Sequence, residues 1–232
     1  MTEASDVIAR REKFVRTAAH DLRNPIAALI GYAALIEGEL DEENRHFLNR
    51  LQETAEKLHY AAASLIELAW LESEMPLEPE RVELGGCIAQ TIEVLTPLAQ
   101  EKSITVSASV EDTLPQVTGD EERLRAAIHH VLHNAIVYSE AGKTVAVRAW
   151  SEVGKVCCSV TDEGYGIAEQ EQERVFDRSF RSADPRVRAV PGGGLGLTVA
   201  RRILQRHGGD IRTESRLDEG SSFTLRLPAE NR

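Results

Sequence analysis

The feature that most constrains the fold is a row of apolar residues, spaced alternately three and four positions apart, in the N-terminal part of the chain. Its members are Ile8, Val15, Ala19, Leu22, Ile26, Leu29, Ala33, Ile36 and Leu40. Residues at this spacing share one face of a helix, so the row predicts a long helix over residues 6–38. Gly38 and the acidic run 39–43 are typical of a helix end and a short loop. Residues 47–68 repeat the spacing, and residues 1–74 are therefore expected to form an antiparallel helical hairpin.

The apolar stripe of this hairpin is longer than two helices can bury against each other. Two copies of the hairpin would bury both stripes in a four-helix bundle, so a homodimer is the arrangement we expect. The alternative is a single hairpin packed against its own downstream domain.

A second domain is expected after residues 75–83, a linker in which Pro76 and Pro79 break the helical pattern. The patterns in residues 84–232 predict helices near 85–101, 120–138 and 196–207, and strands near 103–110, 143–151, 154–162, 209–215 and 221–227. Short turns join several of these strands, which indicates a largely antiparallel sheet. The predicted fold class is α+β, with the helical hairpin followed by an α/β sandwich.

Composition limits the partners and the setting of the chain. A formal net charge of −11 over 232 residues argues against nucleic acid as a partner. No apolar stretch approaches the roughly 18 residues of a membrane span, and the N-terminus lacks the apolar core of a signal peptide, so a cytoplasmic location is expected. Cys87, Cys157 and Cys158 form no CxxC pair and are odd in number, which argues against a disulfide framework.

The segment FVRTAAHDLRNP, residues 14–25, places a candidate nucleophile on the first helix. Asn24 lies one helical turn beyond His20, and Asp21 is next to the ring. A neutral imidazole is nucleophilic near pH 7, and a neighbouring carboxylate can orient it and accept its proton. Pro25 removes a helical hydrogen bond at a cost of roughly 3 kcal/mol, which an ordinary helix has no reason to carry. For these residues alone, an unremarkable surface helix is the alternative.

Two glycine-rich segments of the second domain suggest phosphate binding without a P-loop, whose motif is absent. In DEGYG, residues 162–166, Asp162 ends a predicted strand, and Gly164 and Gly166 permit a tight turn. The segment GGGLGL, residues 192–197, leads into a predicted helix whose first amides could bind phosphate. A plain loop and a flexible helix cap are the respective alternatives.

The predicted helix 120–138 carries Asn134, whose side chain could offer a neutral oxygen ligand to Mg²⁺. His129 and His133 stand at the spacing of a helical zinc site. No third ligand follows at a suitable spacing, so we favour histidines on the surface of the helix.

In order, HDLRNP, the asparagine helix, DEGYG, a phenylalanine pair and GGGLGL closely resemble the H, N, G1, F and G2 boxes of sensor histidine kinases of two-component systems. The resemblance spans nearly the whole chain. It implies a protein-histidine kinase that phosphorylates its own histidine with Mg²⁺-ATP and passes the phosphoryl group to an aspartate of a response-regulator receiver domain. It also implies a conditional response-regulator phosphatase activity. The hairpin would be the HisKA-type dimerisation domain, and the second domain a GHKL ATPase with the Bergerat fold.

The resemblance also implies roles for single residues. His20 matches the phosphoacceptor, Asp21 the acid that assists it, and Asn24 the residue that orients water during dephosphorylation of the regulator. In the second domain, Asp162 matches the acceptor of the adenine amine, which implies ATP rather than GTP because the guanine carbonyl would repel a carboxylate. Residues 167–191 match the mobile ATP lid. The other matched residues are Asn134 for Mg²⁺, Gly164 and Gly166 for the first glycine turn, Gly192, Gly194, Gly196 and Leu197 for the phosphate loop, and Arg181 for the lid arginine near the γ-phosphate.

Four departures from the family pattern put the rate of autophosphorylation in question. His130 stands in place of an asparagine, Val137 in place of a lysine, Ser179 and Phe180 shift the second aromatic of the F box, and Asp218 replaces a glycine of the last glycine box. One alternative is therefore a non-catalytic phosphotransfer or docking scaffold. Another is a serine kinase or conformational ATPase of the same group, which leaves the histidine hairpin unexplained.

Overall fold

The structure is a computed structural model that describes residues 28, 29, 31, 44–51, 54, 55, 58, 62, 77–190 and 192–230. The chain divides into two compact units, residues 1–69 with 191–193, and residues 70–190 with 194–232. In the first unit, residues 28, 29, 31 and 44–51 are helical, in agreement with the two expected helices. The predicted phosphoacceptor His20 and its neighbours Asp21 and Asn24 lie outside the described residues. Within the described residues, no helix is both long and apolar enough to span a membrane.

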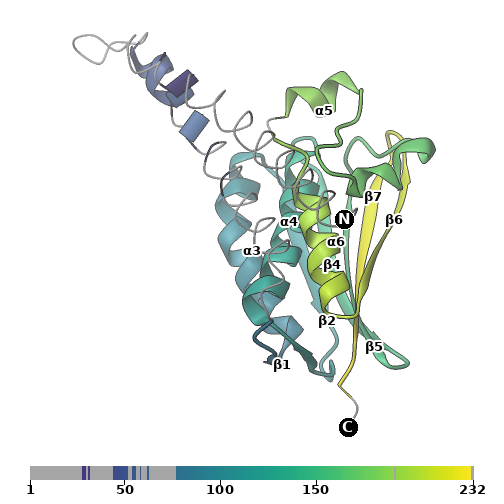
Figure 1. Ribbon diagram of the computed structural model, residues 1–232. Helices are drawn as coiled ribbons and strands as arrows, with labels where there is room; N and C mark the ends of the chain where they lie inside the picture. The colour runs from purple at the N-terminus through teal and green to yellow at the C-terminus, as the bar shows by residue number, and fades with distance from the viewer. Residues whose placement is uncertain are drawn as a thin grey trace, which may run out of the picture. The chain divides into compact units, whose positions relative to one another are not determined.

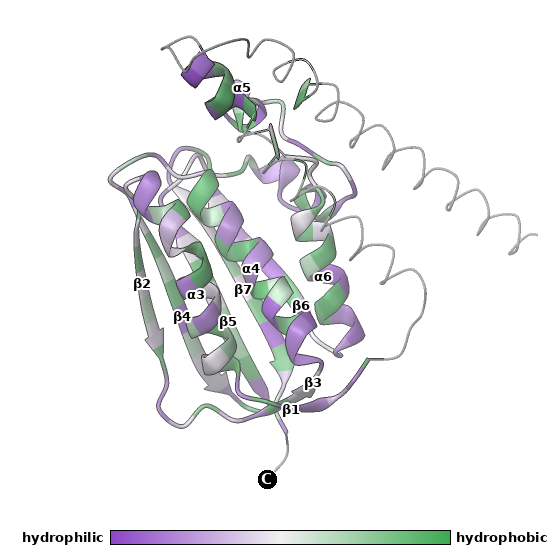
Figure 2. Cartoon of the chain, turned by 90° about the vertical axis from the view of Figure 1, so that its left-hand side faces the viewer, coloured by the Kyte–Doolittle hydropathy of each residue, from purple (hydrophilic) through white to green (hydrophobic). Residues whose placement is uncertain are grey.

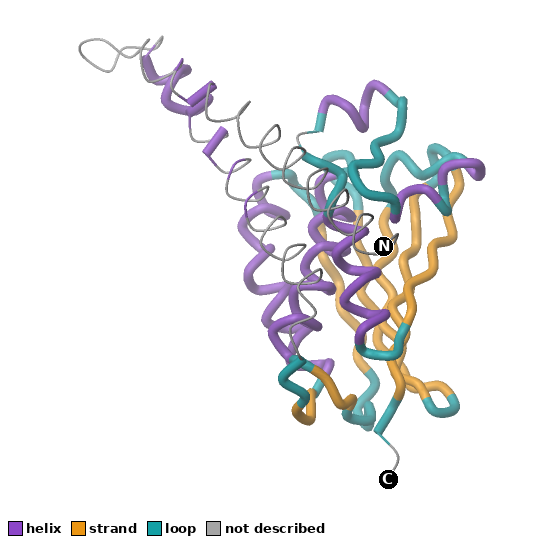
Figure 3. The backbone as a smooth tube through the Cα atoms, in the orientation of Figure 1, coloured by secondary structure: helices purple, strands orange, loops and turns teal. Residues whose placement is uncertain are grey.

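The second unit contains a five-stranded mixed sheet (Figures 1 and 3). The strand order is β2-β4-β5-β7-β6, in which only β2 and β4 pair in parallel. The strands are β2 (Thr105–Val110), β4 (Thr144–Glu152), β5 (Lys155–Asp162), β6 (Asp210–Arg216) and β7 (Gly220–Pro228). The prediction of a largely antiparallel sheet is confirmed. Side chains alternate along β4, where Val147 and Ala149 are buried and Arg148 between them is exposed.

Three helices cover one face of this sheet: α3 (Leu84–Glu101), α4 (Glu121–Val137) and α6 (Gly196–Arg206). Figure 2 shows all three on the same side of the strands. The N-terminus of α4 is capped by Asp120, whose side chain accepts a hydrogen bond from the Arg123 amide at 3.1 Å. The apolar side of α6 is buried through Val199, Ala200, Ile203 and Leu204. The core of this unit therefore lies between the helices and the sheet.

Several short elements were not predicted. The strands β1 (Glu80–Val82) and β3 (Val117–Gly119) pair antiparallel, so the end of the expected linker 75–83 forms a strand of the second unit. The stretch between β5 and α6, for which no helix or strand was predicted, contains two 3₁₀ turns, η1 (Glu169–Glu171) and η2 (Arg174–Phe176), and the helix α5 (Pro185–Ala189). Elements of three to five residues are too short to show a periodic pattern, which explains why they could not be found in the sequence.

His207, the C-cap residue of α6, connects this helix to the start of α4. Its Nε2 accepts a hydrogen bond from the Asp120 amide at 3.0 Å, and its Nδ1 lies 2.8 Å from the Ile203 carbonyl oxygen. Both contacts are satisfied only by a neutral ring protonated on Nδ1. Burial lowers the pKa of His207, which favours this neutral form.

Candidate nucleotide-binding site

Asp162, the last residue of β5, is a buried carboxylate with 6% of its surface exposed. Its Oδ1 accepts hydrogen bonds from the amides of Gly164 at 2.9 Å and Ser221 at 3.2 Å. Burial raises the pKa of Asp162 from 3.8 to about 6, and the two amides oppose this rise. Both donors within the described part of the chain use Oδ1, so Oδ2 is left as an acceptor for an amine of a ligand.

The turn after Asp162 is packed so closely that two of its residues must be glycine. A Cβ on Gly164 would lie 2.5 Å from the Tyr138 carbonyl oxygen. Gly166 has φ +66°, and a Cβ there would collide with the Arg216 carbonyl oxygen. The Tyr165 amide donates to the Tyr138 carbonyl at 3.3 Å. The turn is therefore fixed against the end of α4 on one side and the β6–β7 turn on the other.

Asn134 lies in the last turn of α4, directly before this contact. Its backbone carbonyl accepts the Tyr138 amide at 3.0 Å, and its half-buried side chain makes no hydrogen bond within the described residues. The amide oxygen is thus available to a cation. No group of three histidine, cysteine or acidic side chains that could hold a metal occurs in the residues that the structure describes. A cation at Asn134 would therefore take most of its ligands from phosphate and water, as Mg²⁺ commonly does.

Arg181 joins the 167–190 segment to the end of α4. Its Nη2 donates to the carbonyls of Val187 and Val190. Its side chain also hydrogen-bonds Tyr138, which acts to lower the pKa of that phenol, although burial raises this pKa more strongly. Arg181 thereby connects α5 with the helix that carries Asn134.

The glycine segment before α6 packs against Phe180 and Arg181 through Gly194. This residue has φ +66°, and a Cβ there would collide with the Phe180 carbonyl oxygen and lie 3.2 Å from Cγ of Arg181. Gly196, a buried residue, begins α6, and the half-buried Leu197 follows it. In the first turn of α6, the Thr198 Oγ1 is buried with no hydrogen-bond partner in the described part of the chain. This helix start therefore offers amides and a hydroxyl to a phosphate.

Gly192 is the predicted site residue that these contacts do not include. It lies in the segment 191–193, which groups with the first unit. Its place in a phosphate loop stays a prediction.

The shifted aromatic pair is accommodated in two separate contacts. Phe176 is 8% exposed and packs edge-to-face on Phe223, with ring centroids 6.3 Å apart. Phe180 instead lies under the guanidinium of Arg174, at 4.6 Å. Ser179 between them has φ +59°, so a left-handed residue redirects the chain toward Phe180.

The histidines of α4 are less exposed than the sequence indicated for His129 and His133. His130 is 3% exposed, and His129 and His133 are half-buried and stack with ring centroids 5.9 Å apart. Burial lowers the pKa of His133 to about 4. The physical reason is that α4 packs against both α3 and α6, so few of its positions reach solvent.

The described residues fit an adenine nucleotide. A buried carboxylate offers an acceptor to an amine, an asparagine offers an oxygen to a cation, and a glycine-flanked helix start offers donors to phosphate. Contacts link all three through Tyr138, Arg181 and Gly194. Sequence reasoning did not single out Tyr138 or Ser221, because their role is to bring together segments that are distant in sequence.

Comparison with known proteins also places an ATPase domain in this part of the chain. Residues 119–231 match the family described as "Histidine kinase-, DNA gyrase B-, and HSP90-like ATPase", and residues 10–74 match the "His Kinase A (phospho-acceptor) domain". The chain is 34% identical over 224 residues to the sensor-like histidine kinase SenX3 of Mycobacterium bovis. The matched region covers 95% of this chain and 54% of SenX3. The chain thus spans about half the length of that relative.

Two further proteins extend this likeness. Sensor histidine kinase YcbM of Bacillus subtilis is 30% identical over 220 residues, covering 93% of this chain and 71% of YcbM. The crystal structure of full-length ShkA in complex with AMPPNP has a TM-score of 0.69 at 27% identity, covering 95% of this chain and 46% of ShkA. The matches to both domains, together with the arrangement of the site, show that this chain belongs to the sensor histidine kinase family.

Proposed function

We propose that this chain is the catalytic core of a two-component sensor histidine kinase, which transfers the γ-phosphoryl group of Mg²⁺-ATP to His20. In this proposal residues 1–74 are the dimerisation and phosphotransfer hairpin, 75–83 the linker, and 84–232 the ATP-binding domain. The observation that carries it is the buried Asp162 carboxylate, which lies on a glycine turn tied to the end of the Asn134 helix.

Asp162 selects the base in this proposal. Its Oδ1 is held by two backbone amides, so Oδ2 accepts the exocyclic amine of adenine. Guanine would present a carbonyl oxygen at this point, and two acceptors without a proton between them repel each other. The ShkA complex with AMPPNP, an adenine nucleotide analogue, supports this choice.

Phosphate binding is assigned to the start of α6 and to Arg181. The amides of Gly196 and Leu197 and the Thr198 hydroxyl face no protein acceptor that would compete with phosphate in the described part of the chain, and the helix dipole favours an anion. Asn134 would hold Mg²⁺, which, when bound, neutralises charge on the phosphates. Arg181 is the lid arginine for the γ-phosphate.

The chemical step requires His20 to act as a neutral nucleophile. A ring nitrogen forms a bond to the γ-phosphorus as the bond from that phosphorus to the β,γ-bridging oxygen breaks, and ADP leaves. Asp21 accepts the proton from the other ring nitrogen, which keeps the phosphorylated ring neutral. The phosphoramidate then passes its phosphoryl group to an aspartate of a response-regulator receiver domain, because imidazole is a good leaving group once protonated.

The hairpin is proposed to act as a homodimer, and Asn24 to orient water when the phosphorylated regulator is hydrolysed. Both proposals are supported by the match of residues 10–74 to the phospho-acceptor family.

Incubation of the chain with Mg²⁺ and γ-labelled ATP tests the proposed kinase activity. The expected label is acid-labile and alkali-stable, and it is absent from His20→Ala. Acid-stable label, or release of phosphate alone, would instead support a serine kinase or an ATPase. A chain that takes up no label and yet dimerises would support the scaffold, which the replacements at His130 and Val137 favour.

A further inference from the structure

Each of the last four carbonyls of α4 has a hydrogen-bond donor. A helix leaves these carbonyls without partners inside the regular helical ladder. Here the Asn134 carbonyl receives the Tyr138 amide at 3.0 Å, and the Ala135 carbonyl receives the Ser139 hydroxyl at 2.7 Å. The carbonyls of Ile136 and Val137 both receive Nζ of Lys102, at 3.0 and 2.6 Å. A side chain from outside α4 therefore completes the end of this helix.

Lys102 is the C-cap residue of α3, and it also donates to the carbonyl of Ser139 at 3.1 Å. An ammonium group has three donors, and these three carbonyls use all of them. Lys102 therefore has no proton left for a phosphate oxygen, although it lies beside Val137, the position where the family usually has a lysine. The positive charge also lies at a helix C-terminus, where the dipole stabilises it.

The turn that Lys102 completes carries the predicted ligand-binding groups. Asn134 belongs to this turn, and the Tyr138 carbonyl directly after it receives the Tyr165 amide of the glycine turn next to Asp162. A shift of this helix end would therefore move the cation ligand, and it would disturb the glycine turn that faces the adenine acceptor.

We propose that Lys102 is a positioning residue for Mg²⁺-ATP, which holds the last turn of α4 so that Asn134 and the glycine turn keep their binding geometry. This inference rests on the proposed kinase function. It assigns to Lys102 no contact with substrate. No sequence pattern indicates this role, because it depends on contacts between residues 34 to 37 positions apart.

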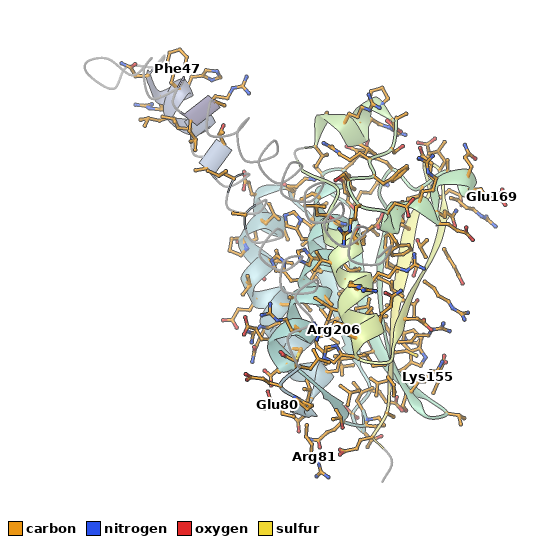
Figure 4. The ribbon with its side chains drawn as sticks, in the orientation of Figure 1. Phe47, Glu80, Arg81, Lys155, Glu169 and Arg206 are labelled. Atoms are coloured by element: carbon orange, nitrogen blue, oxygen red, sulfur yellow. The ribbon has the colours of Figure 1, made fainter. Side chains whose placement is uncertain are left out.

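The test compares Lys102→Met, Lys102→Arg and the control Lys155→Met in the full chain. Lys155 is exposed at the start of β5, and Asp162 ends this strand of 8 residues, so the two lie about 23 Å apart along it. Figure 4 shows Lys155 near one end of the sheet and Glu169, which follows the glycine turn, near the other. ATP binding is measured calorimetrically over a Mg²⁺ titration, and autophosphorylation kinetics give KM and kcat separately.

Lys102→Met is expected to raise the Mg²⁺ concentration needed for half-maximal ATP binding by about tenfold, the size of effect seen when a group that orients a metal ligand is lost. Lys102→Arg keeps the charge but not the placement of three donors on three carbonyls, so it should recover part of this loss. Lys155→Met should match the unchanged chain.

Three outcomes separate the inference from its alternatives. If Lys102→Met lowers the unfolding temperature while Mg²⁺ dependence and KM stay unchanged, Lys102 is merely structural and the inference is wrong. If Lys102→Met does not fold, Lys102→Arg decides in the same way, with an unchanged Mg²⁺ requirement overturning the inference. If the unchanged chain neither binds ATP nor labels His20, the proposed function itself fails.

Discussion

The guanidinium of Arg186, in the short helix α5, lies 2.8 Å from the carboxylate of Asp218 in the β6–β7 turn. Arg186 also pairs with Asp184 at 2.7 Å and lies 4.8 Å from the ring centre of Tyr165 in the glycine turn. Asp218 has φ +63° at the position where the family has glycine. Aspartate in place of glycine therefore retains the left-handed backbone and adds a carboxylate that pairs with Arg186 of the predicted lid.

Asp218→Asn is expected to release α5 without unfolding the chain. Asparagine tolerates the left-handed conformation as well as aspartate does, but it removes the charge that attracts Arg186. Both partners are partly exposed, with side-chain exposures of 42% and 63%, so solvent screens the pair and the global unfolding temperature should hardly change. Limited tryptic cleavage after Arg186 and Arg188 should become faster, and hydrogen exchange of the α5 amides should rise. Equal cleavage rates in the unchanged chain and in Asp218→Asn would show that the Arg186–Asp218 ion pair does not hold α5 in place.

Asp162→Asn should stabilise the nucleotide-free chain and weaken ATP binding. Burial raises the pKa of Asp162 from 3.8 to about 6, so the folded chain binds this proton more tightly than the unfolded chain. Stability is therefore lost as pH rises from about 4 to 6, and the ionised carboxylate costs on the order of 3 kcal/mol above this range. Asparagine keeps an oxygen for the two backbone amides, but its NH₂ faces the adenine amine, donor against donor.

Urea unfolding at about pH 7 and about pH 4.5 checks the stability of this variant, because the linked proton is largely absent at the first and bound at the second. The increase in the free energy of unfolding that Asp162→Asn causes should be largest at about pH 7 and smaller at about pH 4.5. ATP affinity, measured by calorimetry at neutral pH, should fall by about tenfold or more, the effect of one unpaired buried polar group. A variant that is less stable at neutral pH would contradict the burial argument.

Patterns that span a whole element were sufficient to predict most of the second unit. The predicted strand 154–162 corresponds to β5, and its end at Asp162 was expected because a glycine turn follows directly. The predicted helix 120–138 corresponds to α4, which a capping aspartate precedes. Such signals are local, so they can be read before any tertiary contact is known.

The features that were not predicted depend on contacts between distant residues. Lys102 completes a helix 34 to 37 residues away, and Asp162 shares its carboxylate with Ser221, 59 residues away. The burial of His130 follows from the packing of α4 between two other helices, although its position in the sequence is polar. The proposed roles of His20, Asp21 and Asn24 rest on the motif and on the match of residues 10–74 to the phospho-acceptor family, since those three residues lie outside the described part of the chain.

His207→Gln should reduce the acid sensitivity of the second unit. Burial lowers the pKa of His207, so the unfolded chain binds this proton more tightly. The stability that the neutral ring contributes is therefore present above the ordinary histidine pKa of about 6.5 and is lost as pH falls below it. Glutamine can accept the Asp120 amide hydrogen bond but cannot titrate. Glutamine lacks the ring donor to the Ile203 carbonyl, so the variant should be less stable than the unchanged chain near neutral pH. This difference in stability should become smaller as the pH falls.

Thermal unfolding from about pH 7.5 to 5 measures this difference across the range in which histidine titrates. His133, whose pKa is lowered to about 4 by burial, will contribute acid sensitivity to both chains and cancels in the comparison. His46→Gln serves as the control, since His46 is exposed on a helix of the first unit. If the difference in unfolding temperature between the unchanged chain and His207→Gln stays constant with pH, the neutral-ring explanation is rejected.

Asn24→Ala should separate the two activities proposed for the hairpin. In the proposed autophosphorylation the nucleophile is the imidazole of His20. Asn24, four positions further along the sequence, would take no part in the bond to phosphorus, so the rate of labelling should change by less than about twofold. Dephosphorylation of the regulator needs a positioned water, and loss of the amide should slow it by about tenfold or more.

To measure this, the regulator is phosphorylated beforehand by a small-molecule donor and mixed with each form of the chain, and the release of phosphate is followed. His20→Ala controls for back-transfer to the kinase, because it lacks the acceptor. If Asn24→Ala loses labelling and dephosphorylation equally, the residue supports the helix as a whole, and a separate phosphatase role is excluded.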